Sequence, residues 1–325
     1  MRALEDISFT AQEGEITCLL GQSGCGKSTL LNLAAGLLDV QQGSIVLGGE
    51  VLAEAGRNPP PEKRPVGLVF QDGALFPHMT VAKNVGFGLA RADRGAVEGW
   101  LDRVGLHGLG GRYPHELSGG QQQRAALARA MAPGPQVLLM DEPFASVDIV
   151  LRRALRRECR LLLREQGATT ILVTHDPNEA LDVADRIAVM EDGKIVQFGT
   201  PLELHEEPAA ASVGAIFSGA QIVRAQRHDN MLHTAFGDWP VQCLRGDLPD
   251  AETLDLLVSA SDIALFDDGE LSPVRDIQPM GEGSRVLLKG TDGSEITSER
   301  HFTMKTGDAY RVMPMPGTVR AFAAK

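Results

Sequence analysis

The segment from Gly21 to Thr29 has the residue types and spacing of a phosphate-binding loop. Its members are Gly21, Gln22, Ser23, Gly24, Cys25, Gly26, Lys27, Ser28 and Thr29. An apolar stretch ends at Leu20 just before it, and a helical pattern follows it. Glycines in such a loop let backbone N–H groups surround phosphates, while the lysine reaches the β and γ oxygens and the serine hydroxyl binds Mg²⁺. A chance glycine-rich turn is the alternative, and the strand-then-helix context argues against it.

Two adjacent carboxylates end a second apolar stretch. Val137–Met140 is followed directly by Asp141 and Glu142. Asp141 can hold the shell of a Mg²⁺ ion through water, and Glu142 can orient and deprotonate an attacking water. The alternative is an acidic pair stabilised by the dipole of a following helix. The phosphate loop upstream favours the catalytic interpretation.

Gln71 and His175 also follow apolar strands. Gln71 can contact both Mg²⁺ and the water, and so tether the segment after it to the nucleotide. His175 follows Thr170–Thr174 and can donate a hydrogen bond to a γ-phosphate. Either residue alone would be interpreted as polar surface or structure, so these roles depend on the whole set. The other seven histidines are interpreted as structural.

A second glycine-rich segment, residues 117–124, leads into a helical pattern. A Ser-Gly-Gly turn at a helix start directs free N–H groups and the positive end of the helix dipole at an anion. The residues concerned are Ser118, Gly119, Gly120 and Gln121. Because the chain already has a complete phosphate loop, we infer that this segment binds a nucleotide held by a second subunit.

The elements that must position these residues form an α/β pattern over residues 1–218. Buried strands are predicted at Ile16–Leu20, Val137–Met140 and Thr170–Thr174, each followed by a helical stretch. That alternation predicts an α/β domain with a largely parallel sheet. Residues 73–125 are punctuated by glycine and proline, and we expect a helical subdomain inserted there.

The composition changes near Gly219. Short β-like runs separated by Gly-Asp and Asp-Gly turns follow at residues 254–258, 284–289, 309–313 and 318–322. They predict a small β-domain over residues 219–325, a barrel of the oligonucleotide/oligosaccharide-fold type. This segment holds no obvious catalytic cluster.

Composition narrows the class of protein. The 325 residues are 43% hydrophobic, enough for a full core, and carry a formal net charge of −12. An acidic chain is a poor partner for nucleic acid, whose phosphates need basic surfaces. The four cysteines lack paired spacing, which disfavours a disulfide framework or a metal site and fits a reducing cytoplasm.

The chain carries no sign of a secretory or membrane-spanning segment. Its first six residues are too polar for a signal peptide. No apolar run approaches the roughly 18 residues that cross a bilayer. If the protein serves a membrane process, we expect it to do so as a peripheral subunit.

In order and type, these motifs resemble those of ATP-binding-cassette (ABC) transporter ATPases. The resemblance covers residues 1–218 and includes Ala145-Ser146-Val147-Asp148, where valine stands at a position that is commonly leucine. It implies a P-loop NTPase fold and a head-to-tail homodimer that hydrolyses ATP. Each ATP would lie between Lys27 of one subunit and the Ser118-Gly119-Gly120 turn of the other, and Asp148 would cross the interface.

The resemblance also implies partners outside this chain. They are two integral-membrane permease subunits and, through the complex, a periplasmic or extracellular solute-binding protein. The chain would then lie at the cytoplasmic face of the inner membrane. A short permease helix would dock beside Gln71, and Leu75, Phe76 and Met79 are candidates for that contact. The alternative is that these three side chains form the core of the inserted subdomain.

The solute is indicated only by ancestry, because a cassette does not touch it. Residues 61–78 and 113–116 are similar to those of ferric-iron importer ATPases. Polyamine, sulfate and thiamine relatives share much of the sequence of these segments, and phosphonate and sugar importers are further alternatives. Residues 220–325 look like the accessory domain of such importers, although Leu257–Ile263 stands where they usually have an Arg-Pro-Glu element.

One departure from the family concerns adenine. Family members usually stack an aromatic ring on the base, about twenty residues before the phosphate loop. Ala3–Phe9 here matches the segment after that ring, and neither Met1 nor Arg2 is aromatic. We therefore expect this chain to lack the first strand and the adenine platform. ATP binding should be weaker than for a version extended upstream, since base–aromatic stacking is worth ~1–3 kcal/mol.

Two other classes of function fit the sequence less well. ABC-type ATPases of DNA repair insert a long coiled coil after the phosphate loop, and residues 30–116 show no sustained heptads. Ribosome-associated members carry two cassettes and basic segments, whereas this chain has one cassette and is acidic. A scaffold that no longer hydrolyses ATP is disfavoured by Glu142 and His175.

Overall fold

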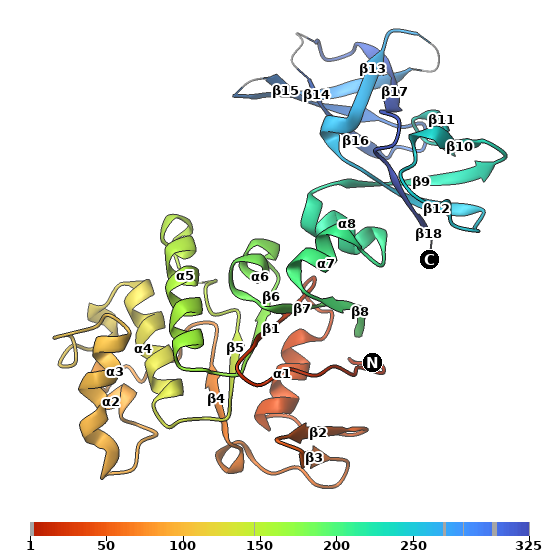
Figure 1. The fold of residues 1–325 in the computed structure, drawn as a ribbon. Coiled ribbons are helices and arrows are strands. Elements are labelled where there is room, and N and C mark those ends of the chain that lie inside the picture. The colour runs from red at the N-terminus through yellow and green to blue at the C-terminus, as the bar shows by residue number, and fades with distance from the viewer. Residues whose placement is uncertain (1–2, 146, 269–270, 282, 301–303, 325) are drawn as a thin grey trace. The chain divides into compact units, whose positions relative to one another are not determined.

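The computed structural model describes residues 3–145, 147–268, 271–281, 283–300 and 304–324. Met1, Arg2 and Ser146, named above, lie outside them. The chain divides into two compact units, Met1–Leu202 and Glu203–Lys325, which are described separately (Figure 1).

The first unit is built on a six-stranded sheet. All five residues of its central strand β1 are buried, as expected for a parallel strand covered on both faces. Neighbouring strands are parallel from β4 to β7, and β8 pairs antiparallel at one edge. This confirms the predicted α/β class. The order across the sheet is β4 (Val66–Val69), β5 (Val137–Asp141), β6 (Thr170–Thr174), β1 (Ile16–Leu20), β7 (Arg186–Glu191) and β8 (Lys194–Gly199).

Helices connect the parallel strands and pack on the sheet. Helix α1 (Lys27–Ala35) follows β1 and contacts β5 and β6. Helix α5 (Ile149–Glu165) connects β5 to β6, and α6 (Pro177–Val183) connects β6 to β7. Helices α5 and α6 pack against each other. Each crossover therefore returns the chain so that the next strand runs in the same direction.

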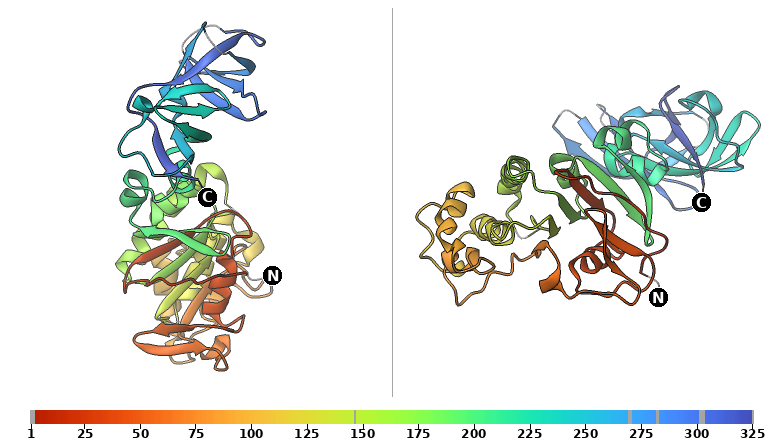
Figure 2. Two further views of the ribbon diagram at one scale, coloured as in Figure 1. Left: turned by 90° about the vertical axis from the view of Figure 1, so that its right-hand side faces the viewer. Right: turned by 60° about the horizontal axis from the view of Figure 1, so that its bottom comes forward.

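Three helices of the segment between β4 and β5 form a group of their own. Helices α2 (Val81–Val85), α3 (Val97–Arg103) and α4 (Gly119–Met131) contact one another, and α4 also contacts β4 and α5. In Figure 1 this group lies to the left of α5, and Figure 2 shows it from two further directions. A separate hairpin of β2 (Ser44–Leu47) and β3 (Glu50–Glu54) lies between α1 and β4 in the chain.

The second unit contains two antiparallel five-stranded sheets, consistent with the predicted barrel-like domain. One has the order β11 (Gly237–Pro240), β10 (Met231–Thr234), β9 (Gln221–His228), β12 (Thr253–Val258), β18 (Arg320–Ala323). The other has the order β13 (Ile263–Phe266), β17 (Ala309–Pro314), β14 (Ser272–Met280), β15 (Gly283–Lys289), β16 (Glu295–Arg300).

Helix α7 (Pro201–Glu206) begins at the division between the units, and α8 (Ala211–Ser218) lies in the second. The boundary expected from sequence lies later, at residue 218. The difference has a packing cause: α8 contacts β9, β12 and β18. Its Gly214 approaches so closely that a Cβ there would lie 2.5 Å from Leu257 Cδ2. The composition change at Gly219 marks the first strand and gives no sign of this docked helix.

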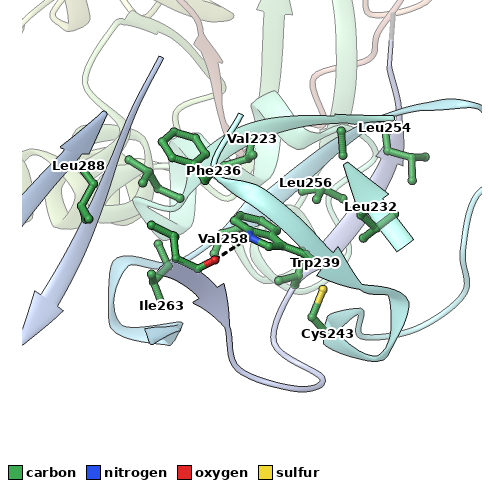
Figure 3. Close-up of a cluster of buried hydrophobic side chains, with 14 of the residues drawn as sticks. Val223, Leu232, Phe236, Trp239, Cys243, Leu254, Leu256, Val258, Ile263 and Leu288 are labelled. Atoms are coloured by element: carbon green, nitrogen blue, oxygen red, sulfur yellow. Dashed lines mark hydrogen bonds between the residues drawn. The ribbon is translucent and has the colours of Figure 1, made fainter. Parts of the chain in front are cut away.

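The core of the second unit is centred on Trp239 (Figure 3). Its side chain is 0% exposed, and its indole Nε1 donates to the carbonyl of Val312, 2.9 Å away. The bond joins β11 to β17 and so links the two sheets. A buried indole N–H needs such a partner, because leaving it unpaired would cost its desolvation.

Candidate functional site

The predicted site residues follow strands that end at one edge of the sheet. Carboxyl ends of parallel strands meet at the same edge, where α/β proteins place their ligands. The register pairs Val69 with Met140, Asp141 with Val173, and Leu20 with Thr174. Within two residues of those paired ends lie Gln71, Glu142, His175 and the start of the phosphate loop. The structure thus gathers four segments that are far apart in sequence.

The phosphate loop closes around the ammonium of Lys27. This side chain is only 4% exposed, and its Nζ donates to the carbonyls of Gly21 at 2.7 Å and Gln22 at 2.8 Å. Gly26 caps helix α1 with a φ of +103°, a conformation that favours glycine. A Cβ at Gly26 would also lie 2.7 Å from the carbonyl oxygen of Ala3.

The other loop residues form its open side and its base. Gln22, Ser23, Gly24 and Ser28 are exposed, Thr29 is half-buried, and Cys25 is buried with its Sγ 3.6 Å from Lys27 Nζ. The loop therefore combines an exposed rim, a buried cation and a helix N-terminus, which together favour an anion.

Ser28 and Asp141 meet across the site. The hydroxyl of Ser28 donates to Asp141 Oδ1 at 3.3 Å. Burial raises the pKa of the Asp141 carboxyl and the charge of Glu142 raises it further, while the Ser28 hydrogen bond and Lys27 act in the opposite direction. Two hard oxygen donors converge here beside the phosphate loop. Such oxygens suit Mg²⁺, which takes one or two carboxylates together with substrate phosphates.

Glu142 and His175 form the second pair of the site. Glu142 Oε1 lies 3.0 Å from His175 Nδ1. The Glu142 side chain is 22% exposed and that of His175 is 54% exposed, so the pair faces the open edge. Glu142 has a φ of +42° and donates its N–H to Val173 O at 2.9 Å. A non-glycine residue held in this conformation is strained, and such strain collects at functional sites.

Gln71 lies at the same edge, and its side chain is exposed. The loop after it is held by Arg129 of helix α4, whose guanidinium donates to the carbonyls of Ala74 at 2.7 Å and Gly73 at 3.0 Å. Burial lowers the pKa of Arg129. Sequence reasoning missed this link, since an arginine within a helical pattern has no distinguishing signal.

Asn84 holds the next part of the same loop. It is fully buried, and its carboxamide accepts from the N–H of Phe76 at 2.8 Å while donating to the carbonyls of Phe76, Met79 and Thr80. This residue was also missed. A polar residue at a core position of helix α2 was the only available signal.

Ser118 and Gln121 cap helix α4 reciprocally. Ser118 Oγ accepts from the Gln121 N–H at 3.4 Å, and Gln121 Oε1 accepts from the Ser118 N–H at 3.0 Å. Gly119, which is exposed, and Gly120, which is half-buried, begin the first turn of the helix. Within the part of the chain that the structure describes, no hydrogen bond or ion pair joins this turn to the phosphate loop. One copy thus does not bring the two predicted phosphate-binding elements together.

Asp148 precedes helix α5 and is exposed. Its carbonyl accepts the N–H groups of Leu151 and Arg152, so it marks the start of the helix. Leu75, Phe76 and Met79 are each half-buried. The ring of Phe76 packs 4.6 Å from that of Phe87, which is itself 56% exposed. These side chains therefore contribute to the subdomain's packing and also reach its surface, and both interpretations of them stay open.

Residues 4–145 match the family model described as "ABC transporter". The sulfate/thiosulfate import ATP-binding protein CysA 2 of Chromobacterium violaceum is 46% identical over 298 residues, covering 88% of this chain and 80% of that protein. The Fe(3+) ions import ATP-binding protein FbpC of Pseudomonas fluorescens is 46% identical over 244 residues, covering 74% and 69%.

A solved structure is similar as well. It is the dimeric, post-hydrolysis state of the ATP-binding cassette MJ0796 bound to ADP and Pi, with 29% identity and a TM-score of 0.52. The match covers 61% of this chain and 90% of that one. In the present chain, no helix among the described residues is long and apolar enough to cross a membrane.

Proposed function

This chain belongs to the ABC transporter family as an import-type ATP-binding subunit, and we propose that it hydrolyses ATP in a head-to-tail homodimer to drive solute uptake. The observation that carries the proposal is the Glu142–His175 contact of 3.0 Å beside the Ser28–Asp141 contact of 3.3 Å. These contacts gather a carboxylate, an imidazole and a pair of oxygens at one sheet edge, where they would serve as base, phosphate contact and metal ligands.

The phosphate loop would bind the β- and γ-phosphates. Lys27 already directs its ammonium into the loop, where phosphate oxygens would replace the carbonyls of Gly21 and Gln22 as its acceptors. Ser28, Gln71 and Asp141 would hold Mg²⁺. When bound, that ion neutralises charge on the phosphate oxygens. Catalysis then depends on positioning and electrostatics rather than on covalent chemistry.

Glu142 would accept the proton of the attacking water. Its carboxylate can only accept, so in the contact with His175 the proton lies on Nδ1. The ring can then donate from Nε2 to the γ-phosphate only when both of its nitrogens are protonated. Its positive charge would then attract the negatively charged phosphate. His175 would therefore orient Glu142 through one nitrogen and contact the phosphate through the other.

The site would be completed by a second copy. The separation of the Ser118-Gly119-Gly120 turn from the phosphate loop within one chain supports this, as does the dimeric state of the similar structure. Gln121 would stabilise the turn through its cap, and Asp148 would cross between the two sites. The N–H groups of the first turn of α4 would face the partner's γ-phosphate.

Complementation between two inactive variants tests the shared site. Lys27→Ala removes the phosphate-loop cation, and Ser118→Phe blocks the turn that faces the partner. Each purified variant should be inactive alone, while a mixture should regain ATP hydrolysis because mixed dimers contain one intact site. Wild-type activity should also rise more steeply than linearly with protein concentration. A mixture that stays inactive, together with a linear wild-type rate, would exclude the shared site.

The wider assembly is also part of the proposal. Two membrane permease subunits and a solute-binding protein would complete the importer, with this chain at the cytoplasmic face of the membrane. Among solutes, ferric iron is supported by the iron-import relative. Sulfate or thiosulfate has its own support, since the sulfate-import relative matches a larger share of this chain. Uptake of ⁵⁵Fe³⁺ and ³⁵S-sulfate by a strain with and without the gene distinguishes them.

A further inference from the structure

Helix α5 carries four arginines at four-residue spacing. The first three each reach a different segment, and the fourth, Arg164, shares Asp185 with Arg160. Arg152, Arg156 and Arg160 stand four residues apart, so they lie one above another along the helix. We call them the α5 arginine row. The repeated spacing looks like an ordinary solvated face in sequence, but all three guanidinium groups contact other parts of the first unit.

Arg152 and Arg160 hold segments at opposite edges of the sheet: Arg152 at the carboxyl edge, where the site lies, and Arg160 at the amino edge. Arg152 Nη2 donates to the carbonyls of Val147 at 3.0 Å and Ala145 at 3.4 Å, in the segment after Glu142. Arg160 Nη2 donates to Asp185 Oδ1 at 2.9 Å. Asp185 in turn accepts the N–H of Ile16 through Oδ2 at 3.1 Å, at the start of β1.

The middle arginine is the buried one. Arg156 is 5% exposed and its Nη2 donates to Asp176 Oδ2. Glu179 Oε2 lies 3.6 Å from Nη2, and Asp182 Oδ2 lies 3.5 Å from Nη1. All three acids belong to helix α6 or its cap. A planar guanidinium can address such a cluster because its donors are fixed in a fork, which a lysine lacks.

Asp176 transmits this contact to His175, its chain neighbour. Asp176 Oδ1 accepts the N–H of Asn178 at 2.9 Å and so caps helix α6. Its Oδ2 is left for Arg156, and its own N–H donates to Thr174 Oγ1 at 3.0 Å. His175 is therefore bracketed by a buried strand residue and by a carboxylate tied to α5. Its half-exposed ring meets only one polar partner among the contacts described, Glu142.

We propose that Arg156 is a positioning residue for ATP hydrolysis, acting through Asp176 to keep His175 within reach of Glu142. The role rests on the proposed function of the Glu142–His175 pair. Arg152 holds the segment that carries Glu142 while Arg156 holds the segment that carries His175, so a single rigid helix sets the distance between two catalytic side chains. Small misplacements of such groups are costly, about a hundredfold in rate for 1 Å.

Four variants test the proposal. Arg156→Lys keeps the charge without the fork, and Arg156→Met removes both. Asp176→Asn keeps the Oδ1 cap, because asparagine and aspartate cap helices equally well. It replaces the carboxylate oxygen that faces the guanidinium with an amide group. Arg157→Met is the matched control, since this neighbour is exposed. We expect kcat to fall about tenfold or more in Asp176→Asn and Arg156→Met, and less in Arg156→Lys.

The KM for ATP should change less than about twofold, because none of these side chains contacts the phosphate loop. The Arg157→Met control should match wild type. A fall in kcat in the control, or equal changes in KM and kcat, would overturn the positioning role. Arg156→Met leaves the buried Glu179 and two half-buried acids without their cation, so Arg156→Lys and Asp176→Asn carry the test if that variant does not fold.

A second readout does not depend on activity. The ¹⁵N chemical shift of His175 Nδ1 in the nucleotide-free protein reports its hydrogen bond to Glu142. It should move in Asp176→Asn and Arg156→Lys but not in Arg157→Met. An unmoved signal in the folded variants would overturn the proposal. A wild-type protein without ATPase activity would instead contradict the proposed function, while leaving this spectroscopic test valid.

Discussion

His175 Nδ1 lies 3.0 Å from Glu142 Oε1, although 33 residues separate the two in the chain. Each follows a strand of the same parallel sheet, and the register of β5 against β6 brings the strand ends together. Glu142 is held there in a left-handed conformation with φ of +42°. The contact therefore depends on strand pairing and on a strained residue, both of which mutations can test.

Glu142→Gln should abolish ATP turnover and leave ATP-driven dimerisation intact. The amide keeps the size of the side chain but cannot accept the proton of the attacking water. Steady-state hydrolysis and size-exclusion chromatography with and without ATP measure the two properties. Undiminished hydrolysis would remove Glu142 from the role of base.

Gly21→Ala should destabilise the first unit. A Cβ there would lie 2.2 Å from the carbonyl oxygen of Met190, so β1 and β7 would have to separate. Overpacking of this kind costs about 1–3 kcal/mol or more of unfolding free energy, measured by urea denaturation. Gly120→Ala is the contrast, because a Cβ there meets nothing within 4 Å. Gly120→Ala should keep the unfolding free energy of the wild type. A larger loss of stability in Gly120→Ala than in Gly21→Ala would contradict the geometry.

Arg129→Met should loosen the loop that follows Gln71. It removes two hydrogen bonds to the carbonyls of Gly73 and Ala74 and leaves both without this donor. We expect a loss of about 1–3 kcal/mol in unfolding free energy and faster proteolysis within residues 71–80. Arg94→Met, at an exposed position of the same subdomain, is the control. Equal proteolysis of the two variants would show that Arg129 does not hold the loop.

Glu179→Gln should flatten the pH dependence of stability. Burial raises the pKa of Glu179 from 4.5 to about 7, against the opposing effect of Arg156. The folded state therefore binds a proton that the unfolded state has released between these values. Stability from this group is greatest below pH 4.5 and falls as pH rises towards 7, by about 1.4 kcal/mol per pH unit.

Urea denaturation of wild type and Glu179→Gln at pH 5, 6, 7 and 8 measures this slope. The variant lacks the titrating carboxyl, so its stability should decline less between pH 5 and 7. Asp182→Asn, which changes another acid near Arg156, should retain the wild-type slope. Identical slopes for wild type and Glu179→Gln would assign the pH dependence to other groups.

Trp239→Phe should destabilise the second unit by about 2–4 kcal/mol, since it removes the bond to Val312 and leaves a void. The chain has only two tryptophans, so the variant lacks the residue that would report on the second unit by fluorescence. Differential scanning calorimetry of the wild type and the variant instead measures the unfolding temperature, which we expect to fall in the variant. ATP hydrolysis should be unaffected, because the proposed site lies wholly in the first unit.

Local patterns in the sequence determined the chemistry of this protein. The phosphate loop, the Asp141-Glu142 strand end and the Ser118-Gly119-Gly120 turn are contiguous, and each is recognisable because its neighbours impose a strand or a helix start. The parallel sheet followed from the same alternation of apolar and helical runs. Gln71 and His175 were assigned from their places after apolar strands, read together with the whole set, and the family resemblance assigned Asp148.

Only the tertiary structure decided how these pieces are held in place. The charged stretch of helix α5 looks solvated in sequence, yet Arg156 is buried against acids of α6, and Arg129 binds a loop more than fifty residues away. Helix α8 likewise belongs to the second unit because it packs on strands β9, β12 and β18. Such contacts depend on strand register and on which helix faces meet, and both are set by distant residues. A local pattern can therefore specify a chemical group without specifying the residues that fix its position.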